Sequence, residues 1–183
     1  KFSKNFWHMA PTKKSKVTKK SKVRSSRGPT GPTDYMNKLS FVLNIKTSNT
    51  APQRGMLLNR FEEPDSTILG ISHSPITRYN RSRQEHEELT ADELKQPGFW
   101  GETMTMKTAW KDDHGTVVAT TRKTFTTSKG YFTVKEVAAN IVKFEKKDRP
   151  KTKWFGGIDA HHVFFEGLHL NPRGSTYSVY WGS

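Results

Sequence analysis

Residues 158–181, with the sequence IDAHHVFFEGLHLNPRGSTYSVYW, contain two apolar runs separated by the turn residues NPRG at 171–174. The first run, 158–170, has large apolar residues on both parities, which is typical of a strand covered on both faces. The second run, 176–181, has its apolar residues on one parity, at Tyr177, Val179 and Trp181. We therefore predict a central strand, a turn and a final strand, so that the chain ends inside its own sheet.

The segment before this hairpin, 133–147, has the spacing of a helix. Val134, Val137 and Ile141 recur at helical intervals, and Thr133 with Glu136 has the pattern of a capping box. A helix is favoured there over a strand. The next stretch, KFEKKDRPKTKW at 143–154, is predicted to be a basic loop that runs into aromatic residues.

A second hairpin is expected further upstream. Residues 102–110 place Met104, Met106 and Trp110 on one parity, and DDHG at 112–115 supplies turn residues before 116–127. That second strand is rich in threonine and poor in large apolar residues, which predicts an edge strand or a strand beneath a polar surface.

The first half of the folded part offers three shorter signals. KLSFVLNIKT at 38–47 alternates apolar and polar residues and predicts the first strand, and 67–73 predicts another. Acidic residues cluster between 84 and 96. Thr90 opens a second capping-box pattern, which predicts a short helix ended by the Pro-Gly pair at 97–98.

Charge is distributed unevenly along the chain. The 183 residues include 31 Lys or Arg and 17 Asp or Glu, a net charge of +14, and the 1–33 segment holds ten of the cations and no acid. The remainder, 34–183, therefore has 21 cations against 17 acids, a balance of only +4. Within the segment, KKSKVT at 13–18 is followed at once by KKSKVR at 19–24. Mutual repulsion and the lack of apolar periodicity predict an extended arm, with a hinge at Gly28, Pro29, Gly31 and Pro32 and folded structure from about Asp34.

Such an arm suits phosphate neutralisation, because each cation that displaces a condensed counterion gains solvent entropy without fixed geometry. The same lysines fit a nuclear import signal, and a solubilising tail is the alternative. A second nucleic-acid site is predicted at the basic loop, where cations contact phosphates and an aromatic ring stacks on a base. The alternative for that loop is a solvated segment with Trp154 turned into the core. The candidate nucleic-acid-binding residues are Lys13, Lys14, Lys16, Lys19, Lys20, Lys22, Arg24, Arg27, Lys146, Lys147, Arg149, Lys151, Lys153 and Trp154.

Other kinds of function have weaker support. There is no cysteine, which excludes disulfides, thiolate zinc sites and cysteine nucleophiles within the chain. On a strand, His161 would share a face with Asp159 and His162 with Glu166, so a metal or nuclease site would have only two ligands on either face unless distant residues join them. We predict no catalytic residue, metal, cofactor or membrane span, and hence a protein that is not an enzyme.

The arm, the strand at 38–47 and the ending HHVFFEGLHLNPRGSTYSVYWGS together resemble the coat proteins of small icosahedral viruses, particularly the single-stranded DNA and satellite types with a single jelly roll. The resemblance implies a mostly β, antiparallel sandwich of eight strands that tiles a shell, with the arm facing a packaged genome. The sequence departs from that pattern, since about seven strands are predicted and a helix is inserted between them.

The resemblance therefore predicts a capsid protein with one antiparallel β domain at 34–183 and one or two short helices. Its partners would be single-stranded DNA or RNA, many copies of itself and nuclear import factors, and it would occur in the virion with a host nuclear stage. The alternative is a cellular nucleic-acid-binding protein, ribosomal or regulatory, with an α+β domain that lays a sheet or the 146–154 loop on RNA or DNA. That protein would be nuclear or ribosome-associated.

Overall fold

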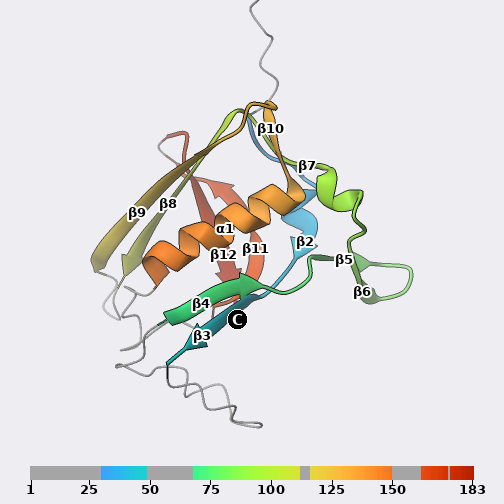
Figure 1. Ribbon diagram of the computed structural model, residues 1–183, viewed down its shortest axis with the longest axis horizontal. Coiled ribbons are helices and arrows are strands. Elements are labelled where there is room, and N and C mark those ends of the chain that lie inside the picture. The colour runs from blue at the N-terminus through green and yellow to red at the C-terminus, as the bar shows by residue number, and fades with distance from the viewer. Residues whose placement is uncertain (1–29, 49–67, 112–115, 150–161, 173) are drawn as a thin grey trace, which may run out of the picture.

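A computed structural model describes residues 30–48, 68–111, 116–149, 162–172 and 174–183 (Figure 1). In this part of the chain the fold is mostly β, with several antiparallel sheets and one α-helix, which confirms the predicted mostly β class. The strands are β1 (Gly31–Pro32), β2 (Leu39–Ser40), β3 (Leu43–Thr47), β4 (Ile68–His73), β5 (Thr77–Asn80), β6 (Glu85–Glu88), β7 (Pro97–Trp100), β8 (Thr103–Lys111), β9 (Val117–Thr126), β10 (Tyr131–Thr133), β11 (Phe164–Leu170) and β12 (Tyr177–Gly182). The helices are α1 (Val134–Asp148) and the short 3-10 helices η1 (Met36–Lys38) and η3 (Glu93–Lys95).

The largest sheet has four strands in the order β11-β12-β8-β9. The predicted hairpin of β8 and β9 is present, and β9 lies at the sheet edge, as its threonine content indicated. The last strand, β12, lies between β11 and β8, so the chain does end inside the sheet. However, β12 runs parallel to β8, in contrast to the purely antiparallel sheet that was expected. The strands in between and α1 separate β12 from β8 along the chain, so no short turn imposes an antiparallel direction on this pair.

The predicted strand at 38–47 is divided into β2 and β3 at Phe41 and Val42. At this point the chain is held on both sides: Phe41 O accepts from Phe165 N, and Val42 N donates to Ser74 Oγ at 3.0 Å. The partner strand is interrupted at the same level, between β4 and β5, where Ser74 N donates to Val42 O at 2.8 Å. The result is one bent hairpin that pairs β3 with β4 and β2 with β5.

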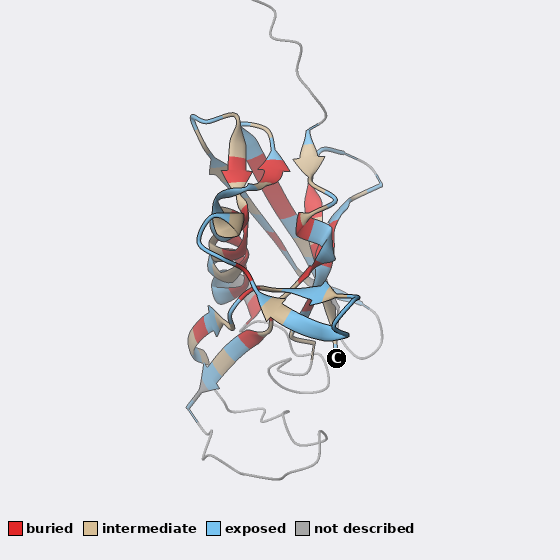
Figure 2. Ribbon diagram, turned by 90° about the vertical axis from the view of Figure 1, so that its right-hand side faces the viewer, coloured by how far each residue is buried: buried red, intermediate tan, exposed pale blue. Residues whose placement is uncertain are grey.

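Helix α1 lies between β10 and β11 in the chain, as the expected inserted helix would, and it supplies much of the core. Its capping box is present as predicted: Thr133 Oγ1 accepts from Glu136 N, and Glu136 Oε2 accepts from Thr133 N. The inward face of the helix is fully buried against strands β4, β7, β9 and β10, and Figures 1 and 2 show the helix lying along the sheets. Each fully buried Val, Ile or Phe contributes about 1.5–3 kcal/mol relative to exposure. The fully buried apolar helix residues are Val134, Val137, Ala138, Ile141 and Phe144.

The prediction that 158–170 is a central strand covered on both faces is wrong for the described part. Strand β11 has a bulge between Phe165 and Gly167, and Gly167 adopts φ 130°, a conformation that favours glycine. The bulge brings Phe165 and Leu168, which have opposite parity, to the same buried side, while Phe164 remains exposed. Strand β11 is also the edge of its sheet, apart from the pairing of its first residues with the chain at 41–43.

Folded structure begins before Asp34. Gly31 and Pro32 form β1, which pairs with β7, and Thr33 N donates to Gly98 O at 2.9 Å. Thr30 O accepts from the Tyr177 hydroxyl at 3.1 Å, so the strand is also tied to β12. The predicted hinge is therefore wrong at residues 31 and 32, and its other half, 28 and 29, lies outside the described residues.

Two further expectations concern helices. The Thr90 capping box is present, and the short helix expected there is the 3-10 helix η3, which ends before the Pro-Gly pair at 97–98, where strand β7 begins. Among the described helices, none combines the length and the apolar composition needed to cross a bilayer.

Candidate nucleic-acid interface

Most of the predicted site residues lie outside the described part of the chain. These are Lys13, Lys14, Lys16, Lys19, Lys20, Lys22, Arg24, Arg27, Lys151, Lys153 and Trp154. Lys146, Lys147 and Arg149 are described, and they lie on the last turn of α1 or directly after it. The prediction of a loop is therefore wrong up to Asp148, since this part of the segment is helical.

Arg149 is not available to a phosphate, so its assignment as a nucleic-acid-binding residue is wrong. The side chain is fully buried, and its Nε donates to Glu145 Oε2 at 2.8 Å. Trp181 Nε1 donates to the other carboxylate oxygen at 3.1 Å, and the guanidinium lies 5.4 Å from the Trp181 ring centre. This cluster connects the end of α1 to β12 and has a structural role.

Lys146 and Lys147 are exposed on the last turn of α1. Cations are favoured there because they face the negative end of the helix dipole and the terminal carbonyl groups. Their position therefore has a structural explanation that requires no ligand, and they remain predicted phosphate contacts.

A surface that the sequence analysis missed is the side of the four-stranded sheet that faces away from α1. The opposite, inward side is identified by Lys123, whose Nζ lies 3.4 Å from Lys143 O on the helix, and by the buried Met104 and Met106. Successive strand residues alternate between faces, so the remaining positions point outward. We call this surface the outer sheet face; its described residues are Thr103, Thr105, Lys107, Ala109, Thr120, Arg122, Thr124, Thr126, Phe164, His169, Ser178 and Tyr180.

Two cations lie opposite each other on the outer sheet face. Lys107 of β8 is the direct cross-strand partner of Arg122 of β9, and both are exposed. Like charges in this position repel each other, and the outward positions on β8, β9 and β12 among the described residues include no carboxylate. Such a pair is more stable when an anion lies between or above the two cations.

Two aromatic rings are exposed on the same face. Tyr180 of β12 is 52% exposed and Phe164 of β11 is 51% exposed. Phe164 points outward because the next residue, Phe165, turns inward and stacks on Phe41 with ring centres 4.5 Å apart. His169 lies beside Tyr180 with ring centres 4.4 Å apart, which fixes one side of the tyrosine and leaves the rest of the ring in solvent.

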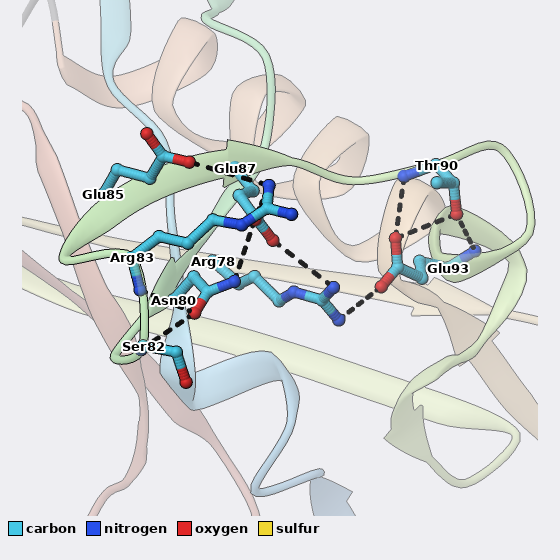
Figure 3. Close-up of polar contacts among 8 residues, drawn as sticks. All are labelled: Arg78, Asn80, Ser82, Arg83, Glu85, Glu87, Thr90 and Glu93. Carbon is cyan, nitrogen blue, oxygen red and sulfur yellow. Dashed lines mark hydrogen bonds and ion pairs between the residues drawn. The ribbon is translucent and has the colours of Figure 1, made fainter.

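The acidic cluster predicted between 84 and 96 forms a separate polar surface on β5, β6 and η3. Figure 3 shows Arg78 between Glu87 and Glu93, with Arg83 reaching the Glu87 carboxylate at 3.1 Å. The Thr90 backbone N–H donates to Glu93 and holds the pKa of this carboxyl below its usual value. These carboxylates make the hairpin a poor surface for a polyanion.

The histidine cluster that was considered for metal binding is only partly described. Asp159 and His161 lie outside the described residues, whereas His162, Glu166 and His169 lie within them. In the described ranges, no three His, Asp or Glu side chains are close enough together to hold a metal ion.

The outer sheet face had one signal in the sequence. The predicted hairpin of 102–110 with 116–127 implies that exposed cations of its two strands lie close together, but the register that places Lys107 opposite Arg122 was unknown. Comparison with known proteins gives no further guidance, since no family, curated protein or solved structure matches the chain.

Proposed function

We propose that the protein is a structural nucleic-acid-binding protein, a coat protein that condenses a single-stranded genome through its basic arm. The observation that carries this proposal is the separation of charge along the chain. Ten of the 31 cations and none of the 17 acids lie in residues 1–33, while the rest of the chain is close to balanced. A polycation joined to a nearly neutral folded unit is suited to binding a polymer of phosphates.

Assembly and packaging would then assist each other. Subunits that associate through their folded domains hold many arms at high local concentration, and the nucleic acid links the arms in turn. The jelly-roll arrangement implied by the resemblance belongs to this proposal. No step of the mechanism requires an active site.

The role of the arm is tested by measuring how the affinity for nucleic acid depends on salt concentration. In one full-length variant, Lys13, Lys14, Lys16, Lys19, Lys20 and Lys22 are all replaced by Gln, and binding to a fluorescent single-stranded 20-mer is measured between 50 and 400 mM salt. If all six lysines contact phosphates, the slope of log affinity against log salt should fall by about 4, since each contact on a single strand contributes about 0.7.

The matched control removes six exposed lysines of the folded part. In the control variant, the side chains of Lys38, Lys46, Lys95, Lys129, Lys135 and Lys143 are replaced by Gln, so the net charge is the same as in the arm variant. An equal loss of slope in both variants would mean that total charge, and not the arm, determines binding, and the proposal would be wrong.

The alternative, a cellular nucleic-acid-binding protein, differs in stoichiometry. The outer sheet face favours this alternative, because it offers a folded surface that a single subunit can use. Sedimentation of the purified protein with and without the 20-mer separates the two functions. Particles of tens of subunits favour the coat protein, and a monomer or dimer with one bound strand favours the cellular protein.

A further inference from the structure

We propose that the outer sheet face is a second binding surface for single-stranded nucleic acid, on which Tyr180 and Phe164 stack on bases while Lys107 and Arg122 bind phosphates. The inference rests on the proposed function and extends it, because it adds a folded contact surface to the arm. It differs from the arm in a measurable way, since stacking is much less sensitive to salt than phosphate contacts are.

Charge complementarity identifies the occupant as a polyanion. Lys107 and Arg122 are adjacent across β8 and β9, and neither has a described carboxylate partner on this face. Arg78, Arg83, Lys95 and Lys129 have carboxylate partners, whereas exposed lysines such as Lys46 and Lys135 also have no described one; Lys107 and Arg122 differ in lying directly opposite each other. The two cations of the outer sheet face are therefore free to neutralise phosphates.

The exposed rings distinguish a single strand from other polyanions. Tyr180 and Phe164 leave about half of their surface in solvent on neighbouring strands of one sheet. Unpaired bases stack on such rings, whereas the bases of a duplex are already stacked and an acidic polypeptide such as poly-glutamate has no ring to stack. A single strand satisfies both the rings and the cations.

The spacing between the Tyr180 ring and the two cations suits a short stretch of nucleotides. The Ser178 hydroxyl donates to Lys107 O at 2.9 Å, so Ser178 lies beside the lysine. Tyr180 is two residues further along β12, which corresponds to about 7 Å. The residues between the ring and the cations are small: Ala109 and Thr120 are direct partners across β8 and β9, so no large side chain separates the two kinds of contact.

One carboxylate borders the face and supplies an additional test. Glu166, at the bulge of β11, extends its carboxylate over Gly182, which is the cross-strand partner of Phe164. A phosphate near Phe164 would be repelled by this charge. Glu166→Gln should therefore tighten binding, by up to about fivefold at low salt.

The main experiment compares two exposed tyrosines in the full-length protein. The probe is a fluorescent oligothymidine 20-mer, measured at 100 and 400 mM salt. Tyr180→Ala should weaken binding roughly fivefold to a hundredfold at both salt concentrations, the range for one stacked base. Tyr180→Phe should bind like the unchanged protein. Tyr79→Ala is the control, because Tyr79 is 51% exposed but lies on β5 beside the acidic cluster, and it should change affinity less than twofold.

The cations are tested separately. Lys107→Gln with Arg122→Gln should lower the salt slope by about 1.4, the value for two phosphate contacts. Poly-glutamate serves as the second probe. The inference is wrong, and the face is a general anion surface, if this double variant loses affinity for poly-glutamate and oligothymidine equally while Tyr180→Ala keeps its affinity for both.

A third experiment uses the unchanged protein, so its result does not depend on whether a variant folds correctly. Oligothymidine containing 5-iodouracil is crosslinked to the unchanged protein, and the modified peptides are identified by mass spectrometry. Crosslinks at Tyr180 or Phe164 support the inference; their absence, together with unchanged binding by Tyr180→Ala, overturns it. If the arm variant alone loses binding, the inference fails and the proposed function stands. If the unchanged protein binds neither oligothymidine nor poly-glutamate, the inference and the proposed function both fail.

Discussion

The Glu145–Arg149 pair shows how the role of a single residue depends on its surroundings. Both side chains are almost completely buried, and Trp181 adds a hydrogen bond and a ring contact from β12. Taking two charges out of water is costly, so the pair stabilises the fold chiefly because neither charge is left alone. In sequence, Arg149 is one of several cations in a basic run, and only its i,i+4 spacing from Glu145 distinguishes it locally from Lys146 and Lys147.

Replacing Arg149 tests this role. Arg149→Leu should lower the free energy of unfolding by about 3–5 kcal/mol, because the Glu145 carboxylate stays buried without its guanidinium. Lys147→Gln, two residues earlier and exposed, should change it by less than about 0.5 kcal/mol. Urea denaturation measures both variants. Equal stability of the two would show that the pair contributes nothing.

Among the elements, α1 was the most predictable and the outer sheet face the least. The helix has its own signals in one continuous segment: the apolar spacing and the capping box both lie within 133–145, and both are confirmed. Strand β11 has no such local guide, because its bulge reverses which residues are buried after Phe165. A one-residue shift of this kind depends on what packs against the strand, here Phe41 and Trp181, which are distant in sequence.

We expect the start of α1 to be sensitive to pH. The pKa of Glu136 is below its ordinary value of 4.5, principally because its carboxylate accepts the Thr133 backbone N–H, with further contributions from the Lys129 and Thr133 side chains. A lowered pKa in the folded state means that the carboxylate stabilises the protein above pH 4.5, and that this contribution is lost as the pH falls through the folded pKa.

Two substitutions at the cap test this contribution. Glu136→Gln should destabilise the protein at pH 7, and its difference from the unchanged protein should shrink as the pH is lowered from 5 to 3. Thr133→Ala should cost about 1 kcal/mol at pH 7, the usual value of an N-cap. Thermal unfolding followed by circular dichroism at several pH values measures both. A difference for Glu136→Gln that stays constant down to pH 3 would contradict the pKa shift.

On the scale of the whole molecule, the folded unit and the arm meet near Thr30. Strand β1, the Thr30–Tyr177 hydrogen bond and the bonds of Thr33 to Pro97 and Gly98 join this region to β7 and β12. Thr33 Oγ1 also accepts from Met36 N at 3.0 Å, at the start of η1. The folded unit therefore includes residues that the sequence analysis assigned to the hinge.

Shortening the chain at two points tests the boundary. Removal of residues 1–33 should destabilise the remainder by about 2 kcal/mol or more, since at least three hydrogen bonds worth about 0.5–1.5 kcal/mol each are lost. Removal of 1–28 keeps β1 and should leave stability within about 0.5 kcal/mol. The midpoints of urea denaturation of the two shortened proteins should differ accordingly. Identical midpoints would place the boundary after β1, as the Gly and Pro residues suggested.

By itself, the sequence determined the mostly β class, the hairpin of β8 and β9, the capped helix and the strong charge asymmetry of 1–33. These features follow from composition or from residues a few positions apart, where side-chain period and local hydrogen bonds act directly. Only the tertiary structure decided the burial of Arg149, the bulge in β11, the parallel pairing of β12 with β8 and the outer sheet face. Each of these depends on strand register and on contacts between segments distant in sequence, because which face of a strand is buried is set by what packs against it.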